Sequence, residues 1–283
     1  MVPVGRTTDA IRSNREIQSD WRTYDRVAEV YERVHAPRTL PVARDFAALA
    51  GIREGAHVLD VGAGTGASAQ AAREAAGSNG LVVGIDPSLE MLAVARGRPG
   101  LRLAAAEAID LPFRDGTFDT VTANFVLSHF AKLDTALYDL IRVLKPGGRV
   151  AASAWADQED EFQKTWRELV EDVTTHELLQ DALTRAMPNE GRLRDPHALE
   201  DTLRGAGLHP VTVERREYRF EMSLEDYIAG RETAASGRFV RDMLGEEEFR
   251  AFGQRVRAAF AERFPERLTD FRDVLLAVGT KPI

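Results

Sequence analysis

HVLDVGAGTG, residues His57–Gly66, is the stretch that decides the fold of this chain. Its apolar run His57–Val61 predicts a short strand, which ends in a loop holding three glycines. A helical pattern follows over 65–76, and a second apolar run, LVVGID (Leu81–Asp86), ends on a carboxylate. The order strand, glycine turn, helix, strand and acid predicts one half of a nucleotide-binding βαβ unit.

The ligand of this unit is predicted to be an adenosine-like cofactor. Glycines let the backbone approach a ligand closely, and Asp86, at the carboxyl end of the second strand, can accept two hydrogen bonds from a ribose diol. The loop alone fits both NAD and S-adenosylmethionine. Asp60, two residues before the first glycine, favours a cationic ligand over a diphosphate, although an acid there also suits a helix cap.

Four blocks of sequence carry a family resemblance: VLDVGAGTG, GIDPSLEML, AEAIDLPFRDGTFDTV and RVLKPGGRV. In this order and spacing they resemble the class I S-adenosylmethionine-dependent methyltransferases, in the subgroup that includes the ubiquinone/menaquinone-biosynthesis enzymes. The resemblance runs from about Tyr24 to Ala154. Beyond Trp155 it does not identify a substrate.

The resemblance implies which residues bind the cofactor. Asp60 and the glycine backbone would hold the methionine end, and Asp86 would bind the ribose hydroxyls. Glu107 stands where the family usually has Asp; with the neighbouring alanine backbone it would read the adenine edge, or it is a solvated acid at a strand end. The implied set is Tyr24, Asp60, Gly62, Gly64, Gly66, Asp86, Met91, Glu107, Ala108 and Asn124.

Strands alternate with helices along most of the chain, which predicts an α/β fold with a doubly wound, Rossmann-like and mostly parallel sheet of seven strands. A helix over 133–144 is expected to stop at the Lys145–Gly148 turn. In the family's fold the last two strands form an antiparallel edge. The predicted strands are 57–61, 81–86, 101–105, 118–124, 149–154, 211–220 and 271–279.

The segments outside this alternation are predicted to be helical. A pattern over 8–34 is broken by Pro37 and Pro41, which predicts an N-terminal helical lid over 1–45. Residues 46–283 would then form the cofactor-binding domain, with helical inserts at about 157–190 and 223–266.

His129, just past the fourth strand, is the first candidate for a general base, because a histidine titrates near neutral pH. His35, which follows the lid helix, is the second. Each also has an ordinary interpretation, as a packing or helix-start histidine. Tyr24 and Tyr31 either cover the cofactor or acceptor or form the apolar stripe of the lid helix.

Aromatic residues at strand ends predict an apolar pocket for the acceptor. Phe125 and Trp155 are the best placed, with Phe130 nearby. Phe162 and Trp166 lie at helical spacing on the first insert, where they either roof this pocket or belong to a core.

Composition narrows the class of protein. The net charge of −8 and the estimated pI of 5.4 argue against a nucleic-acid partner. The chain has no cysteine, and neither thiolate nor other metal ligands occur at regular spacing, so no metal is expected. We expect no membrane-inserted segment, no secretory signal and a cytoplasmic location. No oligomeric state follows from these patterns.

The predicted function is transfer of a methyl group from S-adenosylmethionine to an O, N or C atom of a small, apolar or aromatic metabolite, with S-adenosylhomocysteine as product. Three alternatives stay open. One is an S-adenosylmethionine-binding protein that catalyses a cyclisation or decarboxylation; the others are an NAD(P)-dependent oxidoreductase and a non-catalytic interaction protein built on the fold.

Overall fold

The computed structural model describes residues 20–283. Its seven-stranded sheet has the order β3-β2-β1-β4-β5-β7-β6. Strands β1 to β5 pair in parallel, and β7 runs antiparallel to both β5 and β6. The predicted mostly parallel sheet is therefore confirmed. The strands are β1 (His57–Val61), β2 (Leu81–Asp86), β3 (Arg102–Ala105), β4 (Phe118–Asn124), β5 (Leu144–Trp155), β6 (Val211–Ser223) and β7 (Arg267–Thr280).

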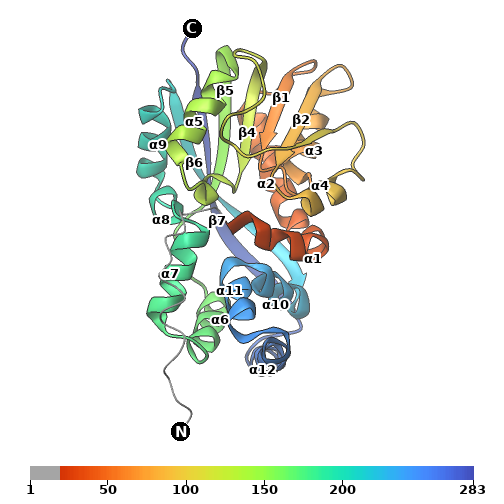
Figure 1. The fold of residues 1–283 in the computed structure, drawn as a ribbon, viewed down its shortest axis with the longest axis vertical. Coiled ribbons are helices and arrows are strands. Elements are labelled where there is room, and N and C mark those ends of the chain that lie inside the picture. Colours follow the sequence, from red (N-terminus) through yellow and green to blue (C-terminus); the bar gives the residue numbers. More distant parts are fainter. Residues whose placement is uncertain (1–19) are drawn as a thin grey trace.

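Helices cover both faces of this sheet (Figure 1). The two faces are set by the period of two along a strand: Leu59 and Val61 of β1 point into one core and Val58 into the other. Helices α5 (Leu133–Arg142) and α9 (Pro196–Gly205) pack into the first core, and α3 (Ala67–Ala76) packs into the second. The strand order reverses between β1 and β4, where such sheets bind their ligands.

The two predicted inserts share one hydrophobic core, which is distinct from the cores on the two faces of the parallel strands and includes Leu268 of β7. Helices of both segments contribute large buried side chains, among them Trp166, Tyr227 and Phe260. Trp166 is 1% exposed and Phe162 packs against the same cluster of buried side chains, so both residues belong to a core and the pocket interpretation is wrong. Figure 1 shows β6 and β7 reaching from the sheet to these helices. The helices are α6 (Glu161–Glu171), α7 (His176–Ala186), α10 (Leu224–Thr233), α11 (Ala235–Leu244) and α12 (Glu246–Arg263).

The N-terminal segment is helical past the position where a break was expected. A 3₁₀ helix, η1 (Asp20–Val27), leads into α1 (Ala28–Val34), and α2 (Ala36–Leu49) follows directly. Pro37 lies in the first turn of α2, next to the boundary between α1 and α2, whereas Pro41 lies inside α2. The predicted break is therefore wrong for Pro41. Burial of Val42 and Phe46 against the sheet outweighs the breaking tendency of Pro41. The predicted helical residues 8–19 lie outside the described part of the chain.

We call η1 and α1 the lid helices. They lie between the sheet and the helices of the inserts (Figure 1), next to α4 (Leu89–Ala95) and α10. Over residues 20–283, no helix combines the length and the apolar character that a bilayer crossing needs.

Candidate active site

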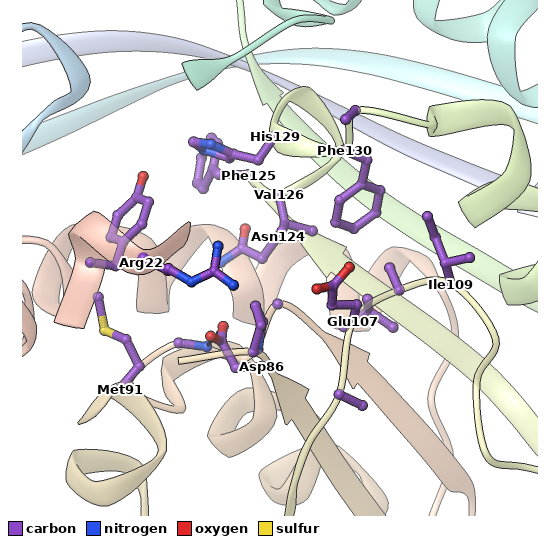
Figure 2. Close-up of a pocket in the computed structure, with 18 of the residues that line it drawn as sticks. Arg22, Asp86, Met91, Glu107, Ile109, Asn124, Phe125, Val126, His129 and Phe130 are labelled. Atoms are coloured by element: carbon purple, nitrogen blue, oxygen red, sulfur yellow. Dashed lines mark hydrogen bonds between the residues drawn. The ribbon is translucent and has the colours of Figure 1, made fainter. Parts of the chain in front are cut away.

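One cavity of about 620 Å³ lies at the carboxyl ends of β1, β2 and β4, next to the lid helices. Its place coincides with the point where the strand order reverses, as the doubly wound topology predicts. Figure 2 shows Asp86, Met91 and Glu107 on one side of it and Phe125 and His129 on the other. The lining residues are Arg22, Tyr24, Tyr31, Val61, Gly62, Gly64, Asp86, Pro87, Met91, Ala106, Glu107, Ala108, Ile109, Asn124, Phe125, Val126, His129, Phe130, Ala131 and Lys132.

The three glycines of the loop 62–66, called the glycine loop here, serve different purposes. Gly64 faces the cavity, has a φ of +54°, and would place a Cβ where no atom lies within 4 Å, so the open space begins directly above it. Gly62 has a φ of +67°, and a Cβ there would lie 2.3 Å from Cγ2 of Val126. Gly62 therefore lets the loop after β4 approach the glycine loop. Gly66 does not line the cavity.

The substitution Gly62→Ala is expected to lower the free energy of unfolding by about 2–4 kcal/mol, because it combines a left-handed backbone with a steric clash. Gly55→Ala is the matched control: its φ is +81°, but a Cβ there meets nothing within 4 Å. Urea denaturation of both variants separates the two causes. Equal losses in the two variants would show that the contact with Val126 is unimportant.

Asp86 is held in place by two backbone amides of neighbouring segments. Its Oδ2 accepts a hydrogen bond from the amide of Gly64 at 2.9 Å, and its Oδ1 accepts one from the amide of Ser88 at 2.9 Å. Burial raises the pKa of Asp86, and the two amides oppose that rise. A carboxylate oxygen has more than one acceptor site, so both oxygens can still accept from a ligand in the cavity.

Asp60 lies beneath the glycine loop and does not line the cavity. It is fully buried, and its Oδ1 accepts hydrogen bonds from Thr122 at 2.7 Å and Ser68 at 2.8 Å. Within the described residues its Oδ2 has no hydrogen-bond partner. Burial raises the pKa of Asp60 from 3.8 to about 7, against the effect of these hydroxyl donors. In this structure Asp60 joins the loop to β4 and α3 and makes no direct contact with the cavity.

The raised pKa of Asp60 makes stability depend on pH. The folded protein holds this proton between about pH 4 and 7 while the unfolded chain has lost it, so the free energy of unfolding contributed by this group falls as the pH rises through that range. Asp60→Asn removes the ionisation. The apo variant is expected to match the wild type near pH 4 and to exceed its stability by about 2–4 kcal/mol at pH 8. Urea denaturation at both pH values checks this; the same difference at both would contradict it.

The residues expected to contact an adenine all line the cavity: Met91, Glu107 and Ala108. Met91 is buried, and its amide donates to the Ser88 hydroxyl, the N-cap of α4, at 3.2 Å. Glu107 is exposed, and its carboxylate points into the cavity (Figure 2).

Asn124 and Phe125 are positioned by a serine of the next strand. The Ser153 hydroxyl donates to Oδ1 of Asn124 at 2.6 Å and accepts from the amide of Phe125 at 3.0 Å. This orients the amide NH₂ of Asn124 as a donor for the cavity it lines. Phe125 has a φ of +55°, a strained conformation for a bulky residue and one that collects at functional sites.

Trp155 does not reach the cavity, so its predicted place in the acceptor pocket is wrong. Its ring stacks on Phe125 with the centroids 4.1 Å apart, and the guanidinium of Arg38 lies over its ring. Trp155 therefore supports Phe125 from behind.

His129 lines the cavity from a 3₁₀ turn, η2 (Leu127–His129). Its Nδ1 lies 3.2 Å from the carbonyl oxygen of Ala186. Because a carbonyl only accepts, Nδ1 carries the proton and Nε2 keeps its lone pair. Burial, reinforced by the charge of Arg238, lowers the pKa of His129 to about 4. The first insert thus fixes the tautomer of the candidate base through Ala186.

His35, the second candidate base, lies outside the cavity, and the structure contradicts that role. Its Nε2 is 3.0 Å from the hydroxyl of Thr233, and its ring packs against Tyr31 with the centroids 4.7 Å apart. Burial lowers the pKa of His35 to about 3. His35 therefore packs the lid helices against α10.

Both predicted lid tyrosines line the cavity. Tyr24 meets Tyr31 and His129 edge-on, at centroid distances of 6.1 and 5.8 Å, and the guanidinium of Arg238 lies 4.0 Å from its ring centroid. Burial raises the pKa of Tyr31, so its hydroxyl stays protonated and can only donate or accept a hydrogen bond.

Two charged residues that the sequence patterns do not predict also line the cavity. Arg22 points into it from η1 (Figure 2), and Lys132 lies at its exposed rim. Neither lies at the end of a strand, so strand-end position does not reveal them. Lys132 lies two residues after Phe130, whose aromatic ring does point to this region.

Comparison with known proteins agrees with this geometry. Residues 59–152 match the methyltransferase domain family. A demethylmenaquinone methyltransferase of Symbiobacterium thermophilum is 36% identical over 137 residues, 44% of this chain and 55% of that protein. The chloroplastic 2-phytyl-1,4-beta-naphthoquinone methyltransferase of Arabidopsis thaliana is 36% identical over 45% of this chain and 54% of its own length. The chain thus spans about half the length of these curated relatives.

A solved structure shares the fold. Phosphoethanolamine N-methyltransferase 2 of Haemonchus contortus, in complex with S-adenosylmethionine, aligns with a TM-score of 0.55 and 19% identity over 92% of this chain and 57% of that one. Residues 59–152 therefore contain a methyltransferase domain. This part of the chain is similar to the methyltransferases of quinone biosynthesis, and the sheet order and the cavity at its switch point agree with that similarity.

Proposed function

We propose that this protein transfers the methyl group of S-adenosylmethionine to an O, N or C atom of a small acceptor that is largely apolar or aromatic. One observation carries the proposal: the cavity that holds the Asp86 carboxylate over the glycine loop also holds a neutral histidine among aromatic rings. A cofactor end and an acceptor end therefore meet in one space.

The cofactor end fits S-adenosylmethionine. Asp86 is fixed to accept from the ribose hydroxyls, Met91 offers an apolar surface to the adenine, and the open space above Gly64 admits a ligand close to the backbone. The oriented NH₂ of Asn124 would donate to the carboxylate of the methionine end.

The acceptor end favours a flat, apolar molecule. Tyr24, Tyr31, Phe125 and Phe130 line it, and aromatic rings bind other rings by stacking or edge-on contact. The two curated relatives are named for quinone-type compounds, which also supports an aromatic ring as acceptor.

In this proposal His129, which lines the cavity, takes the proton that the acceptor loses. When bound, S-adenosylmethionine supplies an electrophilic methyl group on a sulfonium. The chain's part is to align the acceptor with this methyl group and to exclude water. A neutral imidazole with a bare Nε2 can accept a proton from a hydroxyl or amine that becomes acidic as the methyl group arrives. The lowered pKa keeps Nε2 unprotonated at neutral pH and makes His129 a weaker base than an ordinary histidine.

Incubation with methyl-labelled S-adenosylmethionine and a panel of acceptors tests the proposal. The panel contains naphthoquinol-type and phenolic rings, aromatic amines and a charged polymer as the negative arm. We expect labelled product and S-adenosylhomocysteine in equal amounts with one of the ring acceptors. Conversion of an acceptor without gain of the label would support a cyclisation or decarboxylation. Labelling of the polymer alone would contradict the proposed acceptor class.

A further inference from the structure

Arg98 lies where three segments of the site meet. It follows α4, and its guanidinium donates from Nε to the carbonyl oxygen of Thr65 in the glycine loop, at 2.7 Å. Its Nη2 donates to Glu32 of α1 at 2.7 Å, and its Nη1 donates to Gln70 of α3. The Arg98 side chain is only 17% exposed. One planar fork thus joins the glycine loop, the helix after it and the lid.

Gly66 makes room for this arginine. A Cβ at Gly66 would lie 2.9 Å from Cδ and 3.2 Å from Nε of Arg98, and the φ of Gly66 is +88°. Because Gly66 does not line the cavity, contact with a ligand does not account for it. The third glycine of the loop instead lets the Arg98 side chain lie against the backbone.

The lid end of this fork is next to the residues that cover the cavity. Glu32 follows Tyr31 in α1, and Tyr31 lines the cavity together with Tyr24. A second link is parallel to the first: the Ser88 hydroxyl donates to Asp25 of η1 at 2.6 Å, while the Ser88 amide bonds to Asp86. Both links tie the lid helices to the segments that would hold the cofactor.

We propose that Arg98 is a positioning residue that couples the lid helices to the glycine loop, so that retention of the cofactor depends on the Arg98–Glu32 ion pair. This inference rests on the proposed function, since it assumes the cofactor site described above. A guanidinium can serve three acceptors in one plane, which a lysine cannot. Loss of the fork would free the lid from the loop without removing any group that lines the cavity.

The dissociation rate of S-adenosylhomocysteine, measured by stopped-flow competition, tests this coupling. Arg98→Met and Glu32→Gln are each expected to raise the rate by roughly tenfold, the effect of one lost charged hydrogen bond. The double variant should release S-adenosylhomocysteine no faster than Arg98→Met, because the two residues act as one unit. Arg98→Lys keeps the charge but loses the planar fork of donors, so its dissociation rate should lie between those of the wild type and Arg98→Met. Arg96→Met is the matched control, because Arg96 is exposed at the same helix end.

Hydrogen–deuterium exchange gives a readout that a general loss of stability would not imitate. In the apoprotein, Glu32→Gln should raise exchange in the lid helices and leave the strands unchanged. The Glu32 side chain is 36% exposed, so this variant keeps the test valid if Arg98→Met does not fold. Wild-type release rates in Arg98→Met and Glu32→Gln, or effects that add in the double variant, would overturn the inference and leave the proposed function intact. Failure of the wild type to bind S-adenosylhomocysteine would overturn the proposed function itself, and the inference with it.

Discussion

Replacing Asp86 with alanine is expected to weaken the binding of S-adenosylhomocysteine by about 10²–10⁴-fold, because two hydrogen bonds from the ribose to a charged acceptor are lost. The carboxylate is already fixed by the amides of Gly64 and Ser88, so the wild type spends little conformational entropy on binding. Calorimetric titration of the purified variant measures the loss.

Asp86→Asn distinguishes the role of Asp86 in binding the ligand from its role in holding the glycine loop. The amide keeps one acceptor oxygen and the shape of the side chain, so its affinity should fall between those of the wild type and the alanine variant. Glu90→Ala, an exposed position of α4, is the matched control and should bind as the wild type does. An affinity for S-adenosylhomocysteine in Asp86→Ala equal to that of the wild type would contradict the placement of the cofactor site in this cavity.

His129→Gln is expected to lower kcat by about 10²–10⁴-fold while the affinity for S-adenosylhomocysteine changes by less than about twofold, the pattern of a lost general base. The dependence of kcat on pH in the wild type should reflect the titration of His129. Because the pKa of His129 is lowered to about 4, Nε2 stays free of a proton at neutral pH, and kcat should fall only as the pH approaches that value. No inflection is expected near 6.5, the ordinary value for histidine.

His197→Gln provides the control for this prediction, because His197 is exposed on α9. It should leave kcat and its pH profile unchanged. A His129→Gln variant with wild-type kcat would show that no general base is needed at this position and that alignment of the acceptor with the methyl group is sufficient.

The residues that sequence analysis placed well are those at the ends of short parallel strands. Asp86 and Asn124 are the last residues of β2 and β4, Glu107 lies two residues after β3, and all three line the cavity. The reason is physical: the carboxyl ends of parallel strands lie along one edge of the sheet, so position along the chain translates directly into position in space.

The errors occur where neighbouring segments decide the outcome. Trp155 also ends a strand, but its ring turns behind Phe125 and stacks there. His35 is drawn away from the cavity by Thr233, which is far from it in sequence. Pro41 stays helical because of burial against the sheet. The sequence pattern around each of these residues does not show the residues, distant in sequence, that it contacts in the fold.

The glycine loop also contains a residue, Gly66, whose role depends on a contact that is distant in sequence. The pattern of three glycines predicts a ligand-binding loop, and Gly64 behaves in that way. A glycine is needed at position 66 because the side chain of Arg98, which follows α4, lies against the backbone there. The spacing of the glycines does not reveal this contact.

Calorimetric titration of the wild-type protein with S-adenosylhomocysteine and, separately, with NADH tests which cofactor this cavity binds. We expect saturable one-to-one binding of S-adenosylhomocysteine, sharply weakened in Asp86→Ala, and no binding of NADH. Binding of NADH alone, abolished by the same substitution, would contradict a methyltransferase site and assign the cavity to a dinucleotide.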